Sequence, residues 1–350
     1  MNEHCLPELT AYQIQITARA QTPLAFDRQP GQQLRGALFG ILRRHYCPAP
    51  TDPDPGHSAI CPVCWLLARE DENWWRGRDP VRAYTIIPPL DKGPKGRPPY
   101  HYHPGETFTF GVTLFGPAIN LLPYLVLALP EMGRVGVGRP LAENQGRRGR
   151  FTPVRLLCVH PLTGQEQTLL AEGETIVQMP ALAVTTADVI QAAERLAAQC
   201  NGRIRVRFLT PTRIIRQGQL THRPLFRPFF GRLVDRIEGL AREYGQAEKM
   251  DSKPALIAAD HVELVSDETT WVDLTSHSTR TGRTTPAGGF VGLATYSSSQ
   301  WRVLLPWLVW GTLTQVGKNA VKGEGKFEIE NARNWHYSSH KENPCPSFNT

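Results

Sequence analysis

A short glycine- and lysine-rich stretch near the carboxy terminus carries the strongest chemical signal in the sequence. Residues 316–326 read VGKNAVKGEGK and hold three glycines and three lysines but only one acid. Glycine lets a backbone approach a ligand closely and turn its N–H groups outward, while lysine supplies positive charge for phosphates. This glycine-rich loop therefore predicts a surface for a polyanion, with RNA as the leading candidate. Its candidate binding residues are Gly317, Lys322, Gly323 and Gly325.

A second basic segment lies in the first half of the chain. Residues 133–155 contain six arginines and a single acid, Glu143. Crowded like charges repel unless a partner neutralises them, and the guanidinium fork matches pairs of phosphate oxygens. We expect residues 133–150 to form a Gly/Arg loop that binds a polyanion; the alternative is a solvated surface loop. The candidate contacts are Arg134, Arg139, Arg147, Arg148 and Arg150.

Three arginines alternate with apolar residues at 203–208. In a strand this spacing puts Arg203, Arg205 and Arg207 on one face and the apolar side chains on the other. A cationic strand face is typical of sheets that follow an RNA backbone, and Arg213 extends the stripe past a proline. An edge strand protected by charge would show the same pattern.

The cysteines indicate a metal rather than disulfides. Cys61 and Cys64 have the two-residue spacing of a zinc knuckle, Cys47 is a candidate third ligand, and His57 or His45 a fourth. Such a zinc would be structural, since three thiolates leave it a poor electrophile; an unmetallated loop is the alternative. The seven cysteines of the chain are an odd number and are scattered, which favours a reducing cytoplasm over a disulfide framework.

His45 is the histidine best placed for acid–base chemistry. It follows two arginines near the end of a predicted helix, in the run LRRHYC at 42–47. A helix C-terminal cap and a zinc ligand are the competing roles. The sequence holds no phosphate-binding P-loop, no nucleophile elbow and no HExxH zinc motif. The sequence has no run of about 18 apolar residues, so it predicts no membrane span. It also shows no signal peptide, so we expect a cytoplasmic protein.

The elements that must position these residues come in two similar series. Periodicity predicts strands at 11–20, 84–89, 107–115 and 151–160 and helices at 30–46 and 118–129. It then predicts strands at 203–208, 290–296 and 327–330, a hairpin from 262–265 and 271–274, and helices at 186–199, 225–244 and 300–314. Each series follows the order β-α-β-β-α-β, so we predict an α+β protein with two tandem ferredoxin-like (RRM-like) domains. The predicted domains are 1–180, with a cysteine-containing insertion at about 47–80, and 181–331, followed by a flexible tail at 332–350.

Short motifs in a fixed order give the chain a family resemblance. They are LRGA at 34–37, CPVC at 61–64, YTIIPPL at 84–90, PGET at 104–107, TLFG at 113–116, GRVGVG at 133–138, RFLTPTR at 207–213, GFVG at 289–292, and VGK at 316–318 with GEG at 323–325. In this order the chain resembles the repeat-processing endoribonuclease family of CRISPR systems, within the RAMP superfamily of crRNA-binding proteins. The resemblance spans about residues 20 to 330.

The resemblance implies metal-independent cleavage of precursor CRISPR RNA within each repeat. A 2′-hydroxyl would attack the adjacent phosphate and leave a 2′,3′-cyclic phosphate and a 5′-hydroxyl, with a general base, a general acid and cations assisting. In this family the base is often a histidine on or near the first helix, which here is His45; Tyr46 and Lys318 are the implied helpers. The implied partners are the precursor RNA and other CRISPR effector subunits.

One position departs from the family pattern. Relatives often carry a histidine just before the VGK motif, where this chain has Gln315. Glutamine cannot take up a proton at neutral pH. A non-catalytic RAMP subunit that holds crRNA is therefore the main alternative, and a zinc-stabilised scaffold that binds another partner is a third.

Overall fold

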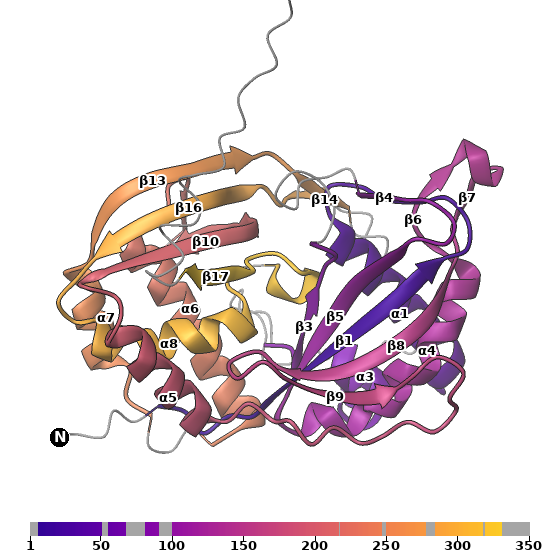
Figure 1. Ribbon diagram of the computed structural model, residues 1–350, viewed down its shortest axis with the longest axis horizontal. Helices are drawn as coiled ribbons and strands as arrows, with labels where there is room; N and C mark the ends of the chain where they lie inside the picture. Colours follow the sequence, from indigo (N-terminus) through magenta and orange to yellow (C-terminus); the bar gives the residue numbers. More distant parts are fainter. Residues whose placement is uncertain are drawn as a thin grey trace, which may run out of the picture.

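Two helix-covered antiparallel sheets make up the protein (Figure 1). The computed structural model describes residues 6–50, 55–67, 81–90, 100–216, 218–246, 250–277, 284–317 and 319–330. The predicted tail at 332–350 lies outside these residues. None of the described helices is long and apolar enough to cross a lipid bilayer.

The first sheet has the strand order of a ferredoxin-like domain. Its elements follow one another as β1 (Ala11–Ala20), α1 (Pro30–Tyr46), β3 (Tyr84–Ile87), β5 (Thr107–Phe115), α4 (Leu122–Val135) and β8 (Phe151–His160). The spatial order is β3-β5-β1-β8, and β9 (Gln165–Leu170) adds a fifth strand beside β8. Alternation along β1 buries Ile14 and Ile16, and α1 buries Leu34 and Leu38 at helical spacing. Helices α1 and α4 therefore cover one face of this sheet (Figure 1).

The second sheet repeats the same topology. Its elements are β10 (Arg203–Thr212), α6 (Phe226–Tyr244), β13 (Glu263–Val272), β16 (Gly289–Ser297), α8 (Trp301–Thr314) and β17 (Phe327–Glu330), in the spatial order β13-β16-β10-β17. An additional helix, α5 (Thr186–Ala197), begins at a capping box in which Thr185 and Asp188 bond each other's backbone N–H groups. The predicted α+β fold of two ferredoxin-like units is confirmed.

Smaller elements decorate this frame. Helices α2 (Pro55–Ile60) and α3 (Pro62–Leu67) follow α1, and α7 (Lys253–Asp260) follows α6. Four short two-stranded ribbons pair β2 (Leu24–Phe26) with β4 (Tyr100–Tyr102), β6 (Val137–Leu141) with β7 (Arg147–Gly149), β11 (Ile214–Arg216) with β12 (Gln219–Thr221), and β14 (Thr275–His277) with β15 (Thr284–Pro286). The 3₁₀ turns are η1 (Gly116–Leu121), η2 (Ala142–Asn144) and η3 (Ala320–Lys322).

Three local predictions were wrong. The hairpin expected at 262–274 is one continuous strand, β13, because its whole length pairs with β16. The helix expected at 118–129 starts as the 3₁₀ turn η1 and then runs as α4 to Val135. The Gly/Arg segment at 133–150 is not an open loop: it holds the end of α4 and the β6–β7 ribbon.

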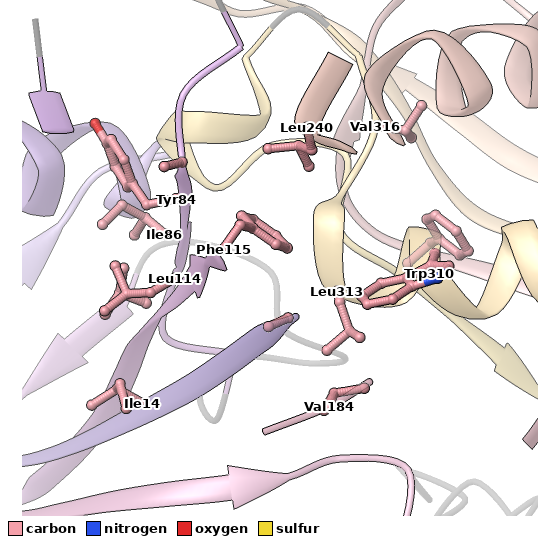
Figure 2. Close-up of a cluster of buried hydrophobic side chains, with 14 of the residues drawn as sticks. Ile14, Tyr84, Ile86, Leu114, Phe115, Val184, Leu240, Trp310, Leu313 and Val316 are labelled. Atoms are coloured by element: carbon pink, nitrogen blue, oxygen red, sulfur yellow. The ribbon is translucent and has the colours of Figure 1, made fainter. Parts of the chain in front are cut away.

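A hydrophobic cluster joins the two halves (Figure 2). Side chains of β3 and β5, among them Ile86 and Phe115, lie beside Leu240 of α6 and Leu313 of α8. Two hydrogen bonds cross the same boundary, from Thr85 Oγ1 to the Leu313 carbonyl oxygen (3.5 Å) and from the Tyr244 hydroxyl to that of Val81 (2.7 Å). The halves therefore share one continuous core; the predicted boundary at residue 180 stays a prediction.

Candidate functional site

The glycine-rich loop connects α8 to β17 and packs against the first half of the protein. Its three glycines have φ angles of 92°, 85° and 72°, which favour residues without a Cβ. A Cβ on Gly325 would lie 1.7 Å from the Val316 carbonyl oxygen, and one on Gly317 would lie 2.7 Å from that of Arg213. Gly323 lies against Pro88 and Gly31. The close packing of the loop, within itself and against its neighbours, therefore requires these glycines. Lys318 lies outside the described residues.

Polar side chains of this region point into the protein. Gln315 is fully buried, and its Nε2 donates to the Ile86 carbonyl oxygen (2.8 Å). Glu324 is 6% exposed, and its Oε1 accepts a hydrogen bond from Gln29 Nε2 (2.8 Å). Burial raises the pKa of the Glu324 carboxyl to about 7. Lys322 is half-buried, so the loop offers less free positive charge than its sequence indicates.

His45 lies at the other end of α1, in its last turn. Its side chain is 44% exposed, and its Nε2 is 3.7 Å from Glu131 Oε1 on α4. Arg134 binds the same carboxylate through two nitrogens, each at 2.7 Å, and this hydrogen bonding lowers the pKa of Glu131 below its usual range. The next residue, Tyr46, donates its hydroxyl to the Leu127 carbonyl oxygen (3.4 Å). An exposed imidazole thus lies beside a carboxylate and a guanidinium. The imidazole can accept or donate a proton, and the guanidinium supplies a positive charge close by.

The two candidate centres are separated by the length of α1. A Cβ on Gly31, in the first turn, would lie 2.2 Å from the Lys322 carbonyl oxygen, so the glycine-rich loop touches the start of the helix. His45 is fourteen residues further on, about 21 Å at a rise of about 1.5 Å per residue. The structure therefore brings His45 and Tyr46 together with Arg134, but not with the described part of the glycine-rich loop.

The β6–β7 ribbon carries three of the predicted arginines, and Arg150 directly follows it. It projects from the edge of the first half (Figure 1). Arg139, Arg147, Arg148 and Arg150 are all exposed. None of these four guanidinium groups has an ion pair with another described residue. Four exposed arginines beside a single acid, Glu143, with which none of them forms an ion pair, make this ribbon the most cationic exposed feature among the predicted binding residues.

Strand β10 shows the predicted separation of faces. Ile204, Val206 and Phe208 are buried, whereas the arginines between them are exposed or half-buried. The edge-strand alternative is wrong, because β10 lies between β16 and β17. The face is not purely cationic, because Arg205 and Arg207 both form ion pairs with Glu330 of β17. The guanidinium of Arg213 donates to the Gly288 carbonyl oxygen (3.1 Å) and so supports the fold, which leaves Arg203 as the exposed arginine of the set.

The four predicted metal ligands converge after α1. The side-chain ligand atoms of Cys47, His57, Cys61 and Cys64 all lie within 4.8 Å of one another. Cys47 Sγ is 3.2 Å from His57 Nε2 and 3.7 Å from Cys64 Sγ. Of the two histidines considered as the fourth ligand, His57 is in this group, whereas His45 faces Glu131. These residues form a cluster that could hold a metal ion.

Two family models match successive parts of the chain. The family model AF_1859_N, an N-terminal domain, matches residues 9–182, and the model of the CRISPR-associated endoribonuclease Cas6 matches residues 206–327. Over residues 206–327 the chain is therefore similar to the CRISPR-associated endoribonuclease Cas6. No curated protein matches it in sequence.

Solved Cas6 structures share its fold. Thermus thermophilus Cas6 in a product complex has a TM-score of 0.52 and 17% identity, over 91% of this chain and 100% of that one. A second structure of the Thermus protein has a TM-score of 0.50 and 14% identity, over 92% and 99% of the two chains. A partial Cas6-RT-Cas1–Cas2 complex has a TM-score of 0.53 and 14% identity, over 93% of this chain and 46% of that one.

One residue of the candidate site was not predicted from the sequence. Glu131 links His45 to Arg134, yet the helix that carries it was expected to end at residue 129. The signal that could have found it is the spacing of Glu131 and Arg134, which lie three residues apart and so share a helix face. The Cas6 match at 206–327 contains most of β10, the helices α6, α7 and α8, and the glycine-rich loop.

Proposed function

We propose that this protein is an endoribonuclease that cleaves precursor CRISPR RNA within its repeats and so supplies guide RNAs to an effector complex. The observation that carries the proposal is the match of residues 206–327 to the CRISPR-associated endoribonuclease Cas6. The fold shared with Thermus thermophilus Cas6 over nearly all of both chains supports it.

The proposed reaction needs no metal and no water. A general base takes the proton of a 2′-hydroxyl, and the oxygen attacks the neighbouring phosphorus. The bond from phosphorus to the 5′-oxygen then breaks, and a general acid returns a proton to that oxygen. The products are a 2′,3′-cyclic phosphate and a 5′-hydroxyl. Cations that face the phosphorane lower the barrier, because negative charge concentrates on its oxygens.

We assign the base to His45. Its exposed imidazole can reach a bound strand, and the Glu131 carboxylate 3.7 Å away can hold the ring in one orientation. Arg134, on the same carboxylate, is the cation nearest to the reacting phosphate in this scheme. Tyr46 is a helper beside it, whereas Lys318, the other implied helper, is proposed to contact the RNA from the glycine-rich loop.

A polymer is the ligand that best fits the spread of these sites. The glycine-rich loop touches the start of α1 and His45 lies near its end, about 21 Å away at about 1.5 Å per residue. The exposed arginines of the β6–β7 ribbon and Arg203 can contact further phosphates away from α1. A single strand of RNA can span such a distance with its backbone and present its bases to a sheet.

Gln315 favours a second candidate function, that of a non-catalytic subunit that holds crRNA. This residue is fully buried and bonded to the Ile86 carbonyl oxygen, so it offers no group to a substrate. If the family's reaction required a histidine there, this chain would bind without cutting. Other CRISPR effector subunits are proposed partners under either function, and the cysteine cluster is proposed to hold a structural zinc.

Single-turnover cleavage separates the two functions. An excess of protein is mixed with labelled CRISPR repeat RNA in EDTA, beside the same RNA with a 2′-deoxy nucleotide at each position in turn. The nuclease proposal expects one cut that a single deoxy substitution abolishes, because the attacking hydroxyl is then missing. Tight binding with no cut in any repeat RNA would support the binding subunit instead.

A further inference from the structure

The cysteine cluster draws its ligands from consecutive short segments. Cys47 is the C-cap of α1, His57 belongs to α2, Cys61 lies between α2 and α3, and Cys64 belongs to α3. Within the described part of the chain this is the one group of three or more Cys, His, Asp or Glu residues whose ligand atoms converge closely enough for a metal. All three cysteines are buried.

The spacing of these atoms fits zinc. Zinc–thiolate bonds are about 2.3 Å, so two sulfurs of a tetrahedral site stand about 3.8 Å apart. The Cys47 and Cys64 sulfurs are 3.7 Å apart, which is far longer than the roughly 2.05 Å of a disulfide. Thiolate and imidazole ligands select zinc over magnesium or calcium, which prefer oxygen. Four protein ligands leave no open position, as in structural zinc sites.

Two buried cysteines outside the cluster serve as a comparison. Cys158 donates to the Leu182 carbonyl oxygen (3.5 Å), and Cys200 to that of Ala197 (3.4 Å). Each lies apart from other thiols and is satisfied by the backbone. In the cluster, three thiols and an imidazole face one another instead. Hydrophobic packing alone does not explain why the polar His57 imidazole lies against the cysteine sulfurs.

The surrounding contacts show what a metal would hold in place. Helices α2 and α3 have six residues each, far too short to be stable alone. The ring of Trp65 in α3 meets that of Tyr244 in α6 edge-on at 5.6 Å, and Arg35 of α1 donates to the Leu67 carbonyl oxygen (3.4 Å). The α2–α3 segment therefore lies between the first helix and the second half of the protein.

We propose that Cys47, His57, Cys61 and Cys64 bind one zinc ion that fastens α2 and α3 to the end of α1 and thereby fixes the last turn of α1. His45 lies two residues before the first ligand, so the ion also sets the place of the imidazole. The four ligands are positioning residues, and the part of the inference that concerns His45 rests on the proposed function.

Metal analysis tests the site directly. The full-length protein is purified under reducing conditions, and its zinc is measured beside that of the Cys61→Ser/Cys64→Ser, His57→Cys and Cys200→Ser variants. About one zinc per chain is expected in wild type, His57→Cys and Cys200→Ser, and little or none in the double variant. A zinc-free wild type that takes up no Zn²⁺ on reconstitution would overturn the site, as would a disulfide among these cysteines in the reduced preparation.

Hydrogen exchange tests the positioning role without relying on activity. Chelation of zinc from the wild-type protein should speed exchange in residues 41–47 and 55–67 by at least about tenfold, because the cross-link that orders them is gone. Helix α5, which shares no residue with the cluster, should be unchanged. Loss of zinc without faster exchange in 41–47 would overturn the claim that the ion fixes α1. If cleavage proves absent, the metal and exchange results still stand, so the two proposals fail separately.

Discussion

Glu324 is an acid enclosed by the loop that was expected to be basic. Its carboxylate accepts from Gln29 of the first half, so a residue of the glycine-rich loop is tied across the boundary between the two units. The sequence marks it only as the single acid of the loop. Its burial depends on the contact with α1, and no local pattern could have predicted that contact.

The raised pKa of Glu324 makes stability depend on pH. The folded pKa is about 7 against 4.5 for the free group, so the folded chain keeps a proton that the unfolded chain has already released. The stability that this group contributes is present below pH 4.5 and is lost as the pH rises through 7. Replacement by Gln removes the loss. The unfolding free energy of Glu324→Gln relative to wild type should therefore grow across this window, by on the order of 3 kcal/mol.

Denaturant titrations at pH 4.5, 6 and 8 would measure this difference. Glu166→Gln is the matched control, because Glu166 is exposed on β9. A difference between Glu324→Gln and wild type that stays constant with pH would contradict the assignment.

The exposed arginines of the β6–β7 ribbon are predicted to contact phosphates. Arg148→Ala should weaken RNA binding about tenfold at low salt, equivalent to about 1.4 kcal/mol. The slope of log Kd against log salt should fall by about 0.7, because one fewer counterion is released from a single strand. Arg19→Ala serves as the control, since the guanidinium of Arg19 is exposed but already bound to Glu172 at 2.6 Å. Equal slopes for wild type and Arg148→Ala would place the RNA on another surface.

At the scale of elements, α1 links the features that matter. Its first turn touches the glycine-rich loop, its last turn carries His45, and Cys47 ends it. The limits of this helix, residues 30–46, were predicted because Pro30 suits the first turn and the apolar residues recur at helical spacing. The neighbours of each end of the helix could not be predicted from the sequence, because they depend on the tertiary fold.

Two glycines in α1 should respond oppositely to alanine. Nothing lies within 4 Å of a Cβ on Gly36, so Gly36→Ala should stabilise the protein by up to about 1 kcal/mol through helix propensity. A Cβ on Gly31 would lie 2.2 Å from the Lys322 carbonyl oxygen, so Gly31→Ala should destabilise by about 1–3 kcal/mol as the loop is pushed away. Chemical denaturation of the pair measures both effects. Similar stabilisation by both substitutions would mean that the loop does not rest on α1.

Strand predictions succeeded where one face of the strand is buried. They failed where the extended conformation depends on pairing with a neighbouring strand. Residues 11–20, 107–115 and 151–160 were predicted with the limits that the structure shows, because clear runs of β-forming residues mark them. In β13 the polar run 266–270 was read as a turn, yet pairing with β16 keeps it extended. Pairing with a neighbour overrides local preference in such strands.

At the scale of the whole molecule, the two ferredoxin-like units act as one packed body around α1, α3 and the glycine-rich loop. Repetition of the β-α-β-β-α-β order could be predicted from periodicity, and the cysteine cluster from its spacing. The separation of His45 from the glycine-rich loop could not, because it depends on how the second unit docks on the first (Figure 2). Because of this separation, we assign the proton transfer to one end of α1 and part of the RNA binding to the other.

Cleavage by a His45 variant is the most direct test of His45 as the general base of a nuclease. Wild type, His45→Ala and His261→Ala, which changes an exposed histidine after α7, are each mixed in excess with labelled repeat RNA in EDTA. We predict one cut that ends in a cyclic phosphate for wild type and His261→Ala. For His45→Ala we predict a cleavage rate lower by about 10²-fold or more, with RNA binding unchanged. A cut by His45→Ala at the wild-type rate would contradict the assigned base, and wild-type protein that binds the repeat but never cuts it would contradict the proposed nuclease.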